Sequence, residues 1–336
     1  MKSVCIVIPS YKSKGKLSKV LEEIETISNE LKSDFEIKTI VVNDNCPLDS
    51  WKEIKKKSNT QIIHNKKNLG VGASTLYGFK IAIQKGFDGV IRLDSDGQHS
   101  PLYLKSIIPY LFSIPENQTI LIKGSRYIFR IDSSEIPWAR KIGSILLEPI
   151  ARAAISCRGL SDISNGFFAM NNLTCRILSG AKFGPKLKMR YLFESSLMVR
   201  TTFFDIPIHV FAMNPKYGDE WQSSMQSKKM IVPLILFWVK ATVLRILNNY
   251  IFRLNLGSLL LTLFFSTSLV STNLFFSTIS PSIKADITVS AGNSTFFTTS
   301  SAVAIFSILL FFYYDYASGR KAKKLIFPEF LEELKI

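Results

Sequence analysis

Cysteine and histidine are scarce in this chain of 336 residues, which has four of the first and three of the second. The four cysteines show neither a CxxC motif nor mixed Cys/His spacing, so the pattern excludes the usual structural zinc sites and predicts free thiols. The sequence also has no P-loop or dinucleotide-binding fingerprint. Internal repeats and low-complexity linkers are absent as well. These absences argue against zinc-binding, P-loop and dinucleotide-binding proteins.

Charged residues are missing from two long stretches. Asp, Glu, Lys, Arg and His are absent from Leu254–Ile283 and from Ile287–Tyr314. Each stretch exceeds the roughly 20 residues that an α-helix needs to cross a bilayer core, so we expect two membrane spans. At the N-terminus, the apolar run Val4–Ile8 is too short for a signal-peptide core and ends at Pro9, so no export signal is expected.

Basic residues flank the two expected spans on the same side. Arg245 and Arg253 precede the first span, and Arg320, Lys321, Lys323 and Lys324 follow the second. The positive-inside rule then predicts a multi-pass protein of the cell (inner) membrane with both ends and the bulk of the chain in the cytoplasm. The formal net charge of +16 favours membrane lipids and phosphorylated substrates as partners, and not nucleic acid.

The segment before the first span is apolar but keeps Lys240 and Arg245, with Pro233 near its start. This composition is typical of a helix that lies in the membrane interface. The expected organisation is a cytosolic domain at 1–225, an interfacial helix at 226–252, a two-helix transmembrane hairpin at 253–317 and a cytosolic tail at 318–336.

Apolar strand patterns alternate with helical patterns through the cytosolic domain. Strands are expected at 3–8, 37–42, 61–64, 90–93, 120–127, 162–170 and 205–212, and helices at 12–31, 51–57, 70–83, 102–112 and 138–155 and from residue 190. This alternation predicts an α/β fold with a doubly wound, mostly parallel sheet. In such sheets ligands bind at the carboxyl ends of the strands.

Two acids one residue apart follow the expected strand Val90–Leu93. Because side chains alternate along an extended chain, Asp94 and Asp96 can lean to the same side. Two hard oxygen donors, together with the Gln98 amide, suit a divalent cation that also holds phosphate oxygens. The alternative is a pair of surface acids that cap the next helix. We predict a metal site, and we regard His99 as a residue worth testing beside it.

Polar residues at other expected strand ends suggest a nucleotide site. Asp44 is placed to accept hydrogen bonds from a nucleobase or ribose, the alternative being an Asx turn. Gly70 and Gly72 could let the backbone approach a ligand, although glycines before a helix are also ordinary turn residues. Arg126 follows small residues that leave room for a phosphate, the alternative being a solvated side chain.

Taken together, the motifs of this sequence resemble those of the polyprenyl-phosphate glycosyltransferases of the dolichol-phosphate mannose synthase type, within glycosyltransferase family 2. The resemblance covers residues 1 to about 250. It implies a GT-A fold and metal-dependent (Mg²⁺ or Mn²⁺), inverting transfer of a sugar from a UDP- or GDP-linked donor to a polyprenyl phosphate. The motifs that carry it are Val42-Asn43-Asp44, Asn68-Leu69-Gly70-Val71-Gly72-Ala73, Asp94-Ser95-Asp96-Gly97-Gln98-His99, Gly124-Ser125-Arg126-Tyr127, Asn165-Gly166-Phe167, Arg190-Tyr191-Leu192-Phe193-Glu194 and Tyr217-Gly218-Asp219-Glu220.

The resemblance also implies roles for individual residues, with the catalytic domain on the cytoplasmic side. Glu194, placed near the acceptor, could equally pair with Arg190 four residues earlier. The nucleotide-sugar site would comprise Pro9, Tyr11, Asp44, Gly70, Asp94, Ser95, Asp96 and Arg126. The acceptor site would comprise Asp162, Asn165, Arg190 and Glu194. Catalysis would fall to Asp94, Asp96, Arg126 and Glu194, and the metal to Asp94, Asp96 and Gln98.

Three departures from the family pattern keep alternatives open. Lys12 and Ser13 stand where Asn and Glu are frequent, Phe168 where Arg is frequent, and Asn43 where an acid is common. One alternative is a glycosyltransferase that extends a lipid-linked saccharide in polysaccharide assembly. Another is a catalytically silent relative that binds nucleotide-sugar or tethers partners at the membrane. A processive synthase is disfavoured, since no Gln-x-x-Arg-Trp follows the acids. Homo-oligomerisation stays open.

Overall fold

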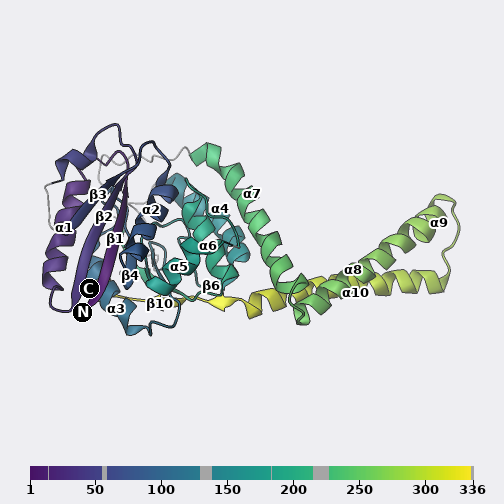
Figure 1. The fold of residues 1–336 in the computed structure, drawn as a ribbon. Helices are drawn as coiled ribbons and strands as arrows, with labels where there is room; N and C mark the ends of the chain where they lie inside the picture. The colour runs from purple at the N-terminus through teal and green to yellow at the C-terminus, as the bar shows by residue number, and fades with distance from the viewer. Residues whose placement is uncertain (14, 55–58, 129–137, 183, 215–226, 334–336) are drawn as a thin grey trace. The chain divides into compact units, whose positions relative to one another are not determined.

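The computed structural model describes residues 1–333 apart from 14, 55–58, 129–137, 183 and 215–226. Two compact units are present. The first joins Met1–Val239 with Lys321–Ile336, and the second is Lys240–Arg320. The first unit holds the α/β sheet and the candidate site, and the second is helical (Figure 1).

The first unit is built around one eight-stranded sheet in the order β10-β8-β5-β7-β4-β1-β2-β3. All neighbouring strands are parallel except β7, which is antiparallel to both β4 and β5. The prediction of a mostly parallel, doubly wound sheet is therefore confirmed. The strands are β1 (Lys2–Ser10), β2 (Phe35–Asn43), β3 (Thr60–His64), β4 (Gly89–Arg92), β5 (Leu121–Ser125), β7 (Phe168–Asn171), β8 (Ile208–Ala212) and β10 (Lys323–Leu325), with β6 (Cys157–Arg158) and β9 (Arg320–Lys321) outside the sheet.

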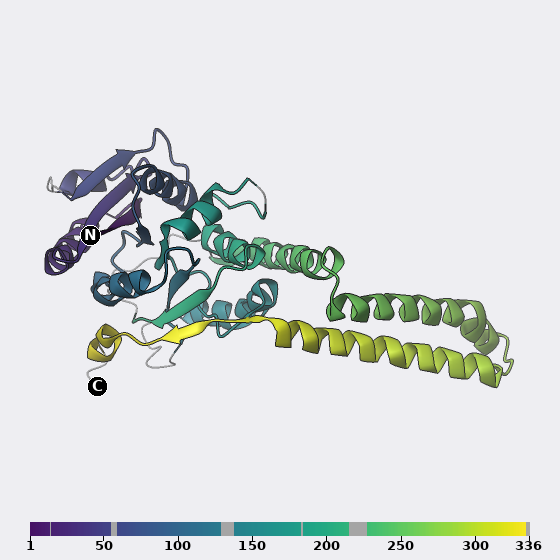
Figure 2. The ribbon, with the colours of Figure 1, turned by 60° about the horizontal axis from the view of Figure 1, so that its bottom comes forward.

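Helices cover both faces of this sheet (Figures 1 and 2). Side chains alternate along β1, so Val4, Ile6 and Ile8 join the core beneath α1 and α3, while Val7 faces Gly78 of α2 on the other face. Burial on both faces explains why the strands are continuously apolar. The helices of this unit are α1 (Leu17–Glu30), η1 (Ser50–Glu53), α2 (Val71–Gln84), η2 (Pro101–Tyr103), α3 (Leu104–Ser113), α4 (Trp138–Ile155), α5 (Asn172–Gly180), α6 (Phe193–Phe203) and α11 (Pro328–Glu333).

The end of the chain returns to the sheet. Residues 318–336 were expected to form a tail, but β10 pairs in parallel with β8 and extends the sheet at its edge. Phe327 and Phe330 join the same hydrophobic core as α1 and α3. Ser106 Oγ of α3 donates a hydrogen bond of 2.8 Å to Glu329 of α11. The first unit is therefore completed by residues that follow the helices of the second unit.

The expected strand over 162–170 is wrong for its first part. Asp162 adopts a left-handed backbone conformation with φ +53°, and the Asn165 backbone N–H donates to the Asp162 carbonyl at 3.0 Å, so this part is a turn. Only Phe168–Asn171 forms a strand, and it is antiparallel. The helix expected from Arg190 begins at Phe193.

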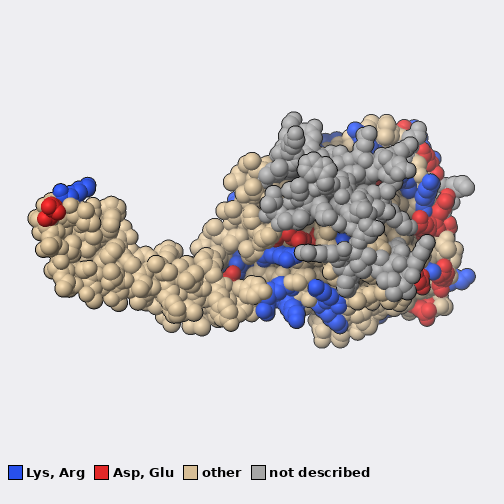
Figure 3. All heavy atoms as spheres, turned by 180° about the vertical axis from the view of Figure 1, so that it is seen from behind, with Lys and Arg blue, Asp and Glu red and all other residues tan. Residues whose placement is uncertain are grey.

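The second unit consists of helices with few charged side chains (Figure 3). Three helical segments, Val232–Ile251, Leu256–Lys284 and Ala291–Ser318, are long and apolar enough to cross a membrane. Within this unit, α8 and α10 pack side by side as a hairpin. Its elements are the end of α7 (Ser227–Ile246), η4 (Leu247–Ile251), α8 (Leu256–Leu274), η5 (Phe275–Ile279), α9 (Ser280–Lys284) and α10 (Ala291–Ser318).

A partly buried ion pair joins two helices of the second unit. The Arg245 guanidinium donates to both oxygens of Asp315 at 2.6 and 2.8 Å, and the Tyr250 hydroxyl donates to the same carboxylate at 2.6 Å. A bidentate pair of this kind holds the end of α7 against the end of α10.

Candidate active site

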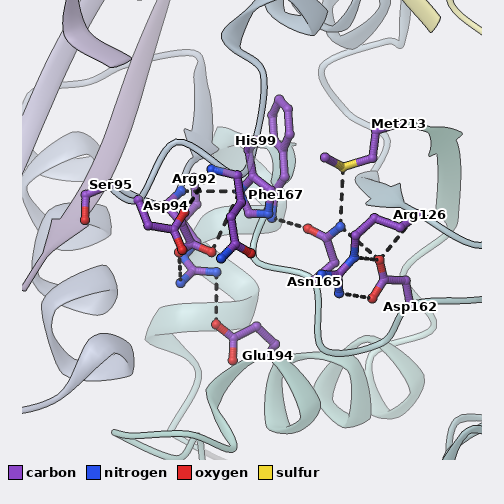
Figure 4. Close-up of polar contacts among 12 residues, drawn as sticks. Arg92, Asp94, Ser95, His99, Arg126, Asp162, Asn165, Phe167, Glu194 and Met213 are labelled. Carbon is purple, nitrogen blue, oxygen red and sulfur yellow. Dashed lines mark hydrogen bonds and ion pairs between the residues drawn. The ribbon is translucent and has the colours of Figure 1, made fainter. Parts of the chain in front are cut away.

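Charged side chains meet beyond the carboxyl end of β4. Asp94 is partly exposed, with 30% of its side chain accessible, and its Oδ1 lies 2.6 Å from Nη2 of the buried Arg92. Nη1 of the same guanidinium lies 2.9 Å from Oε1 of Glu194, in the first turn of α6. Figure 4 shows the two carboxylates approaching Arg92 from two sides. The Arg92 guanidinium therefore links Asp94, at the carboxyl end of the sheet, to Glu194, in the first turn of α6.

The two acids of this cluster respond differently to burial. Burial is the largest single influence on Asp94 and would raise its pKa, but the charges of Arg92, His99, Arg126 and Lys123 together outweigh it and lower the pKa below its ordinary value. For Glu194, burial is the larger influence and raises the pKa, with Asp94 adding to the increase and Arg92 opposing it. Two carboxylates that share one guanidinium are thus biased toward different protonation states, which is common at functional sites.

The turn after Asp94 is held by one local hydrogen bond and by one contact with the distant Ser13. The Gln98 backbone N–H donates to Oδ1 of Asp96 at 3.1 Å, and the hydroxyls of Ser95 and Ser13 lie 2.5 Å apart. Asp96 is partly exposed, whereas Ser95 and Gln98 are buried. Asp96 therefore presents a carboxylate near the surface of a rigid turn.

His99 lies behind Asp94. Its Nδ1 is 3.7 Å from Oδ2 of Asp94 and accepts the Asp94 backbone N–H at 3.4 Å, while its ring packs against Phe167 with centroids 5.6 Å apart. Burial, together with the charges of Arg126 and Arg92, lowers the pKa of His99 to about 4 despite the opposing influence of Asp94. His99 is therefore neutral at neutral pH.

A second ion pair lies beyond β5. Arg126 donates to Asp162 through Nε at 2.7 Å, Nη2 at 2.6 Å and its backbone N–H at 3.0 Å. The Asn165 amide donates to the same carboxylate at 3.1 Å, and Lys123 donates to the Asn165 carbonyl. Despite burial, the charge of Arg126 and its hydrogen bonds lower the pKa of Asp162 well below its ordinary value. Arg126 and two predicted acceptor residues thus form one network.

Asp44 supports the loop before α2. Its Oδ1 accepts the Leu69 N–H at 2.8 Å and the Asn65 amide at 2.9 Å, and its Oδ2 accepts the Gly70 N–H at 2.8 Å. Asn43 makes the Asx turn, accepting the Cys46 N–H at 3.1 Å. Both carboxylate oxygens of Asp44 thus accept hydrogen bonds from the protein. Nucleotide binding by Asp44 stays a prediction.

Gly70 and Arg190 lie together at the rim of this loop. Gly70 has φ +97°, and a Cβ there would come within 2.5 Å of Cγ of Arg190. Arg190 donates to the side chain and carbonyl of Asn68 at 3.0 and 3.2 Å. The alternative pairing of Arg190 with Glu194 is wrong, because Glu194 points to Arg92.

The remaining predicted residues are scattered around this edge. Pro9 is buried at the end of β1 beside Val42, and Tyr11 is 43% exposed. His64 lies 3.0 Å from the Asn43 amide, and His209 lies 3.0 Å from the Tyr110 hydroxyl. Both histidines therefore have structural contacts. The segment Tyr217–Glu220 lies outside the described residues.

Two buried cations were missed by sequence reasoning. Arg92 is 1% exposed and Lys123 is fully buried, both on strands whose other residues are mostly apolar. Burial lowers the pKa of Lys123 to about 8, against the opposing charges of Asp162 and Glu194. The signal that could have found them is a lone basic residue inside an apolar strand pattern, since buried charges are normally paired.

The donor chemistry fits a divalent metal ion. Asp94, Asp96 and Gln98 provide the carboxylate and amide oxygens that Mg²⁺ and Mn²⁺ bind, and both acids are partly exposed. No three His, Cys, Asp or Glu side chains converge on one point within the described ranges. Water and the oxygens of a diphosphate would complete the coordination, which is usual for Mg²⁺.

A mostly parallel sheet with acids beyond the carboxyl end of β4 is the arrangement that the resemblance to GT-A glycosyltransferases implies. The chain belongs to glycosyl transferase family 2, whose family model matches residues 5–173. The resemblance recognised in the sequence is thereby confirmed at the level of the family.

Named relatives agree with this assignment. Polyprenol monophosphomannose synthase of Mycolicibacterium smegmatis is 22% identical over 169 residues, 49% of this chain and 60% of the relative. UDP-N-acetylglucosamine–dolichyl-phosphate N-acetylglucosaminyltransferase of Methanococcus voltae is 23% identical over 194 residues, 53% of this chain and 73% of the relative.

The matches span about half to three quarters of the length of the curated relatives. Among solved structures, mannosyl-3-phosphoglycerate synthase from Rubrobacter xylanophilus is similar with a TM-score of 0.48 and 13% identity, over 76% of this chain and 77% of that chain.

Proposed function

We propose that the protein transfers a sugar, with inversion, from a nucleotide-diphospho-sugar to a membrane polyprenyl phosphate. The observation that carries the proposal is the pair of partly exposed acids, Asp94 and Asp96, at the carboxyl edge of a family 2 sheet whose chain also carries a helical membrane unit. The names of the relatives, a polyprenol monophosphomannose synthase and a dolichyl-phosphate transferase, support a lipid phosphate as acceptor.

On the donor side, Asp94, Asp96 and Gln98 would hold Mg²⁺ or Mn²⁺. When bound, the ion neutralises the charge that develops on the departing nucleoside diphosphate. Arg126 would add positive charge next to that group, and its pairing with Asp162 keeps the guanidinium in a fixed orientation.

On the acceptor side, the reaction needs little help from a base. A lipid phosphate is already anionic near neutral pH, so it attacks the sugar carbon without first losing a proton. The chain has only to orient it and to exclude water. Asp162, Asn165, Arg190 and Glu194 are the residues proposed for that task, and Glu194 is held toward the site by Arg92.

The return of the chain to the sheet supports a two-span topology. Residues before 239 and after 321 belong to one unit, and β8 and β10 are paired, so both lie on one side of the membrane. An even number of crossings must separate them. Crossing by α8 and α10, with Val232–Ile251 lying in the interface, meets this condition. The basic residues beside the spans favour the cytoplasm for that side.

The reaction is tested with membranes that contain the full chain. Labelled UDP- and GDP-sugars with undecaprenyl phosphate are expected to give a chloroform-soluble, mild-acid-labile sugar lipid that requires Mg²⁺ or Mn²⁺. Asp96→Ala is expected to abolish this product, whereas Asp286→Ala, an acid between α9 and α10, is expected to leave it unchanged. Absence of labelled lipid with every donor, from protein that binds nucleotide, would refute the proposal.

The topology is tested by cysteine labelling. The four native cysteines are buried, so background labelling by a membrane-impermeant maleimide is expected to be low. Ser282→Cys in α9 is expected to react from outside intact cells, and Lys323→Cys in β10 only after lysis. Reaction of both from the same side would contradict the two-span arrangement.

A further inference from the structure

We propose that Arg92 is a positioning residue, whose guanidinium fixes Asp94 and Glu194 relative to each other and so aligns the donor and acceptor sides of the reaction. The inference rests on the proposed function and deepens it. It is carried by one buried side chain that contacts carboxylates from two separate elements of the fold (Figure 4).

The geometry excludes direct contact between Arg92 and substrate. The residue is 1% exposed and lies within the strand β4. Its Nη2 lies 2.6 Å from Asp94 and its Nη1 2.9 Å from Glu194, so each terminal nitrogen forms an ion pair with one carboxylate. A planar guanidinium can bridge two acids in this way, whereas a lysine ammonium is a single point charge.

The surrounding chain holds the guanidinium in place. A Cβ at Gly166 would lie 2.0 Å from Nη1 of Arg92 and 2.5 Å from Oδ2 of Asp94, so only glycine allows this loop to pass so closely. On another side, the Phe168 ring centroid is 5.8 Å from the guanidinium carbon. Arg92 is thus enclosed, and it holds Asp94 and Glu194 at a fixed distance from each other.

The two partners belong to the two halves of the proposed reaction. Asp94 follows the end of β4 and is one of the proposed metal and donor residues, while Glu194, in the first turn of α6, is one of the proposed acceptor residues. A displacement of about 1 Å between reacting groups can cost a factor of about 10² in rate. Loss of the bridge is therefore expected to reduce turnover more than it reduces folding.

A structural explanation makes a different prediction. Arg92→Met leaves two carboxylates without their counter-charge and is therefore expected to lower stability, so its turnover is compared per folded molecule and set against the amount of folded protein. The matched control is Arg200, another buried arginine of the same unit, which donates to the carbonyls of Pro185 and Ala181 at 3.1 and 3.0 Å. Arg200→Met removes a buried guanidinium without touching Asp94 or Glu194.

The experiment compares full-length Arg92→Met, Arg92→Lys and Arg200→Met in detergent or membranes. Thermal unfolding, binding of nucleoside diphosphate with Mn²⁺, kcat and both KM values are measured for each. We expect Arg92→Met to lower kcat by about 10², Arg92→Lys to recover only a small part, and Arg200→Met to keep its activity per folded molecule. In the background Glu194→Gln, Arg92→Met is expected to cost less than in the wild type.

Several results would overturn the inference. Full activity in Arg92→Lys would show that a point charge suffices. A loss in Arg92→Met that matches the loss of folded protein, or a loss that Glu194→Gln does not change, would make the role structural. Nucleotide binding is measured without any acceptor. If the wild type binds nucleotide but makes no lipid product, the proposed function fails. In that case the positioning role is judged by nucleotide binding alone, and it is overturned if Arg92→Met binds nucleotide with Mn²⁺ as tightly as the wild type does.

Discussion

The carboxylate of Asp44 accepts the backbone N–H of Gly70 at 2.8 Å, which ties the end of β2 to the start of α2. With the Leu69 N–H and the Asn65 amide on the other oxygen, one buried acid satisfies three donors. The glycine-containing loop is therefore shaped from within the fold.

Replacement of this acid is expected to destabilise the protein. Asp44→Asn turns one acceptor oxygen into an amide donor that faces backbone N–H groups. Leaving buried donors unsatisfied costs about 1–3 kcal/mol. Thermal and denaturant unfolding of the purified chain measure the change, and the exposed Asp34→Asn serves as control. Equal stability of the two variants would contradict the role assigned to Asp44.

Gly166→Ala is expected to reduce activity strongly, because the added Cβ would collide with Nη1 of Arg92. Displacement of the Arg92–Asp94 pair is expected to lower turnover by about 10². The control is Gly180→Ala, where a Cβ meets nothing within 4 Å. Steady-state kinetics of both variants test this, and unchanged turnover in Gly166→Ala would show that the loop adapts without effect on the site.

The buried His99 predicts a loss of stability in acid. Its pKa is lowered from 6.5 to about 4, so the unfolded chain binds more protons than the folded chain between these values. Stability is therefore expected to fall as the pH drops from 6.5 to 4, by about 3 kcal/mol at most. Unfolding free energies of the wild type and His99→Gln across this range isolate the effect. Parallel curves would contradict it.

The segment that follows α10 is expected to be essential for the catalytic unit. Phe330 is 4% exposed in the core beneath α1 and α3, whereas its neighbour Leu331 is 43% exposed. Phe330→Ala is expected to cost about 3–5 kcal/mol, and Leu331→Ala about 0.5 kcal/mol or less. Unfolding measurements on both variants provide the comparison. Similar small losses would mean that α11 contributes little to the core.

Much of the fold could be predicted from local patterns. Continuous apolar strands, such as Ser3–Ile8, and the amphipathic spacing of Leu17, Val20 and Leu21 predicted elements that the structure contains. The strand predicted over 162–170 was extended too far toward the N-terminus from the apolar run Phe167–Met170, across the turn in which Asp162 has a left-handed backbone. The strand β10 was missed because three residues at the end of a basic tail carry too little periodicity.

The sequence by itself determined the α/β alternation, the apolar helices and the acidic turn at Asp94 and Asp96, because each depends on neighbouring residues and on their period. Only the tertiary structure decided the partners of Arg92, Lys123 and Asp44. Apart from the Arg92–Asp94 pair, these contacts join residues far apart in the chain, and they exist because a buried charge needs a counter-charge or hydrogen-bond partners. The meeting of Asp94 with Glu194 through Arg92 is therefore a property of the folded protein alone.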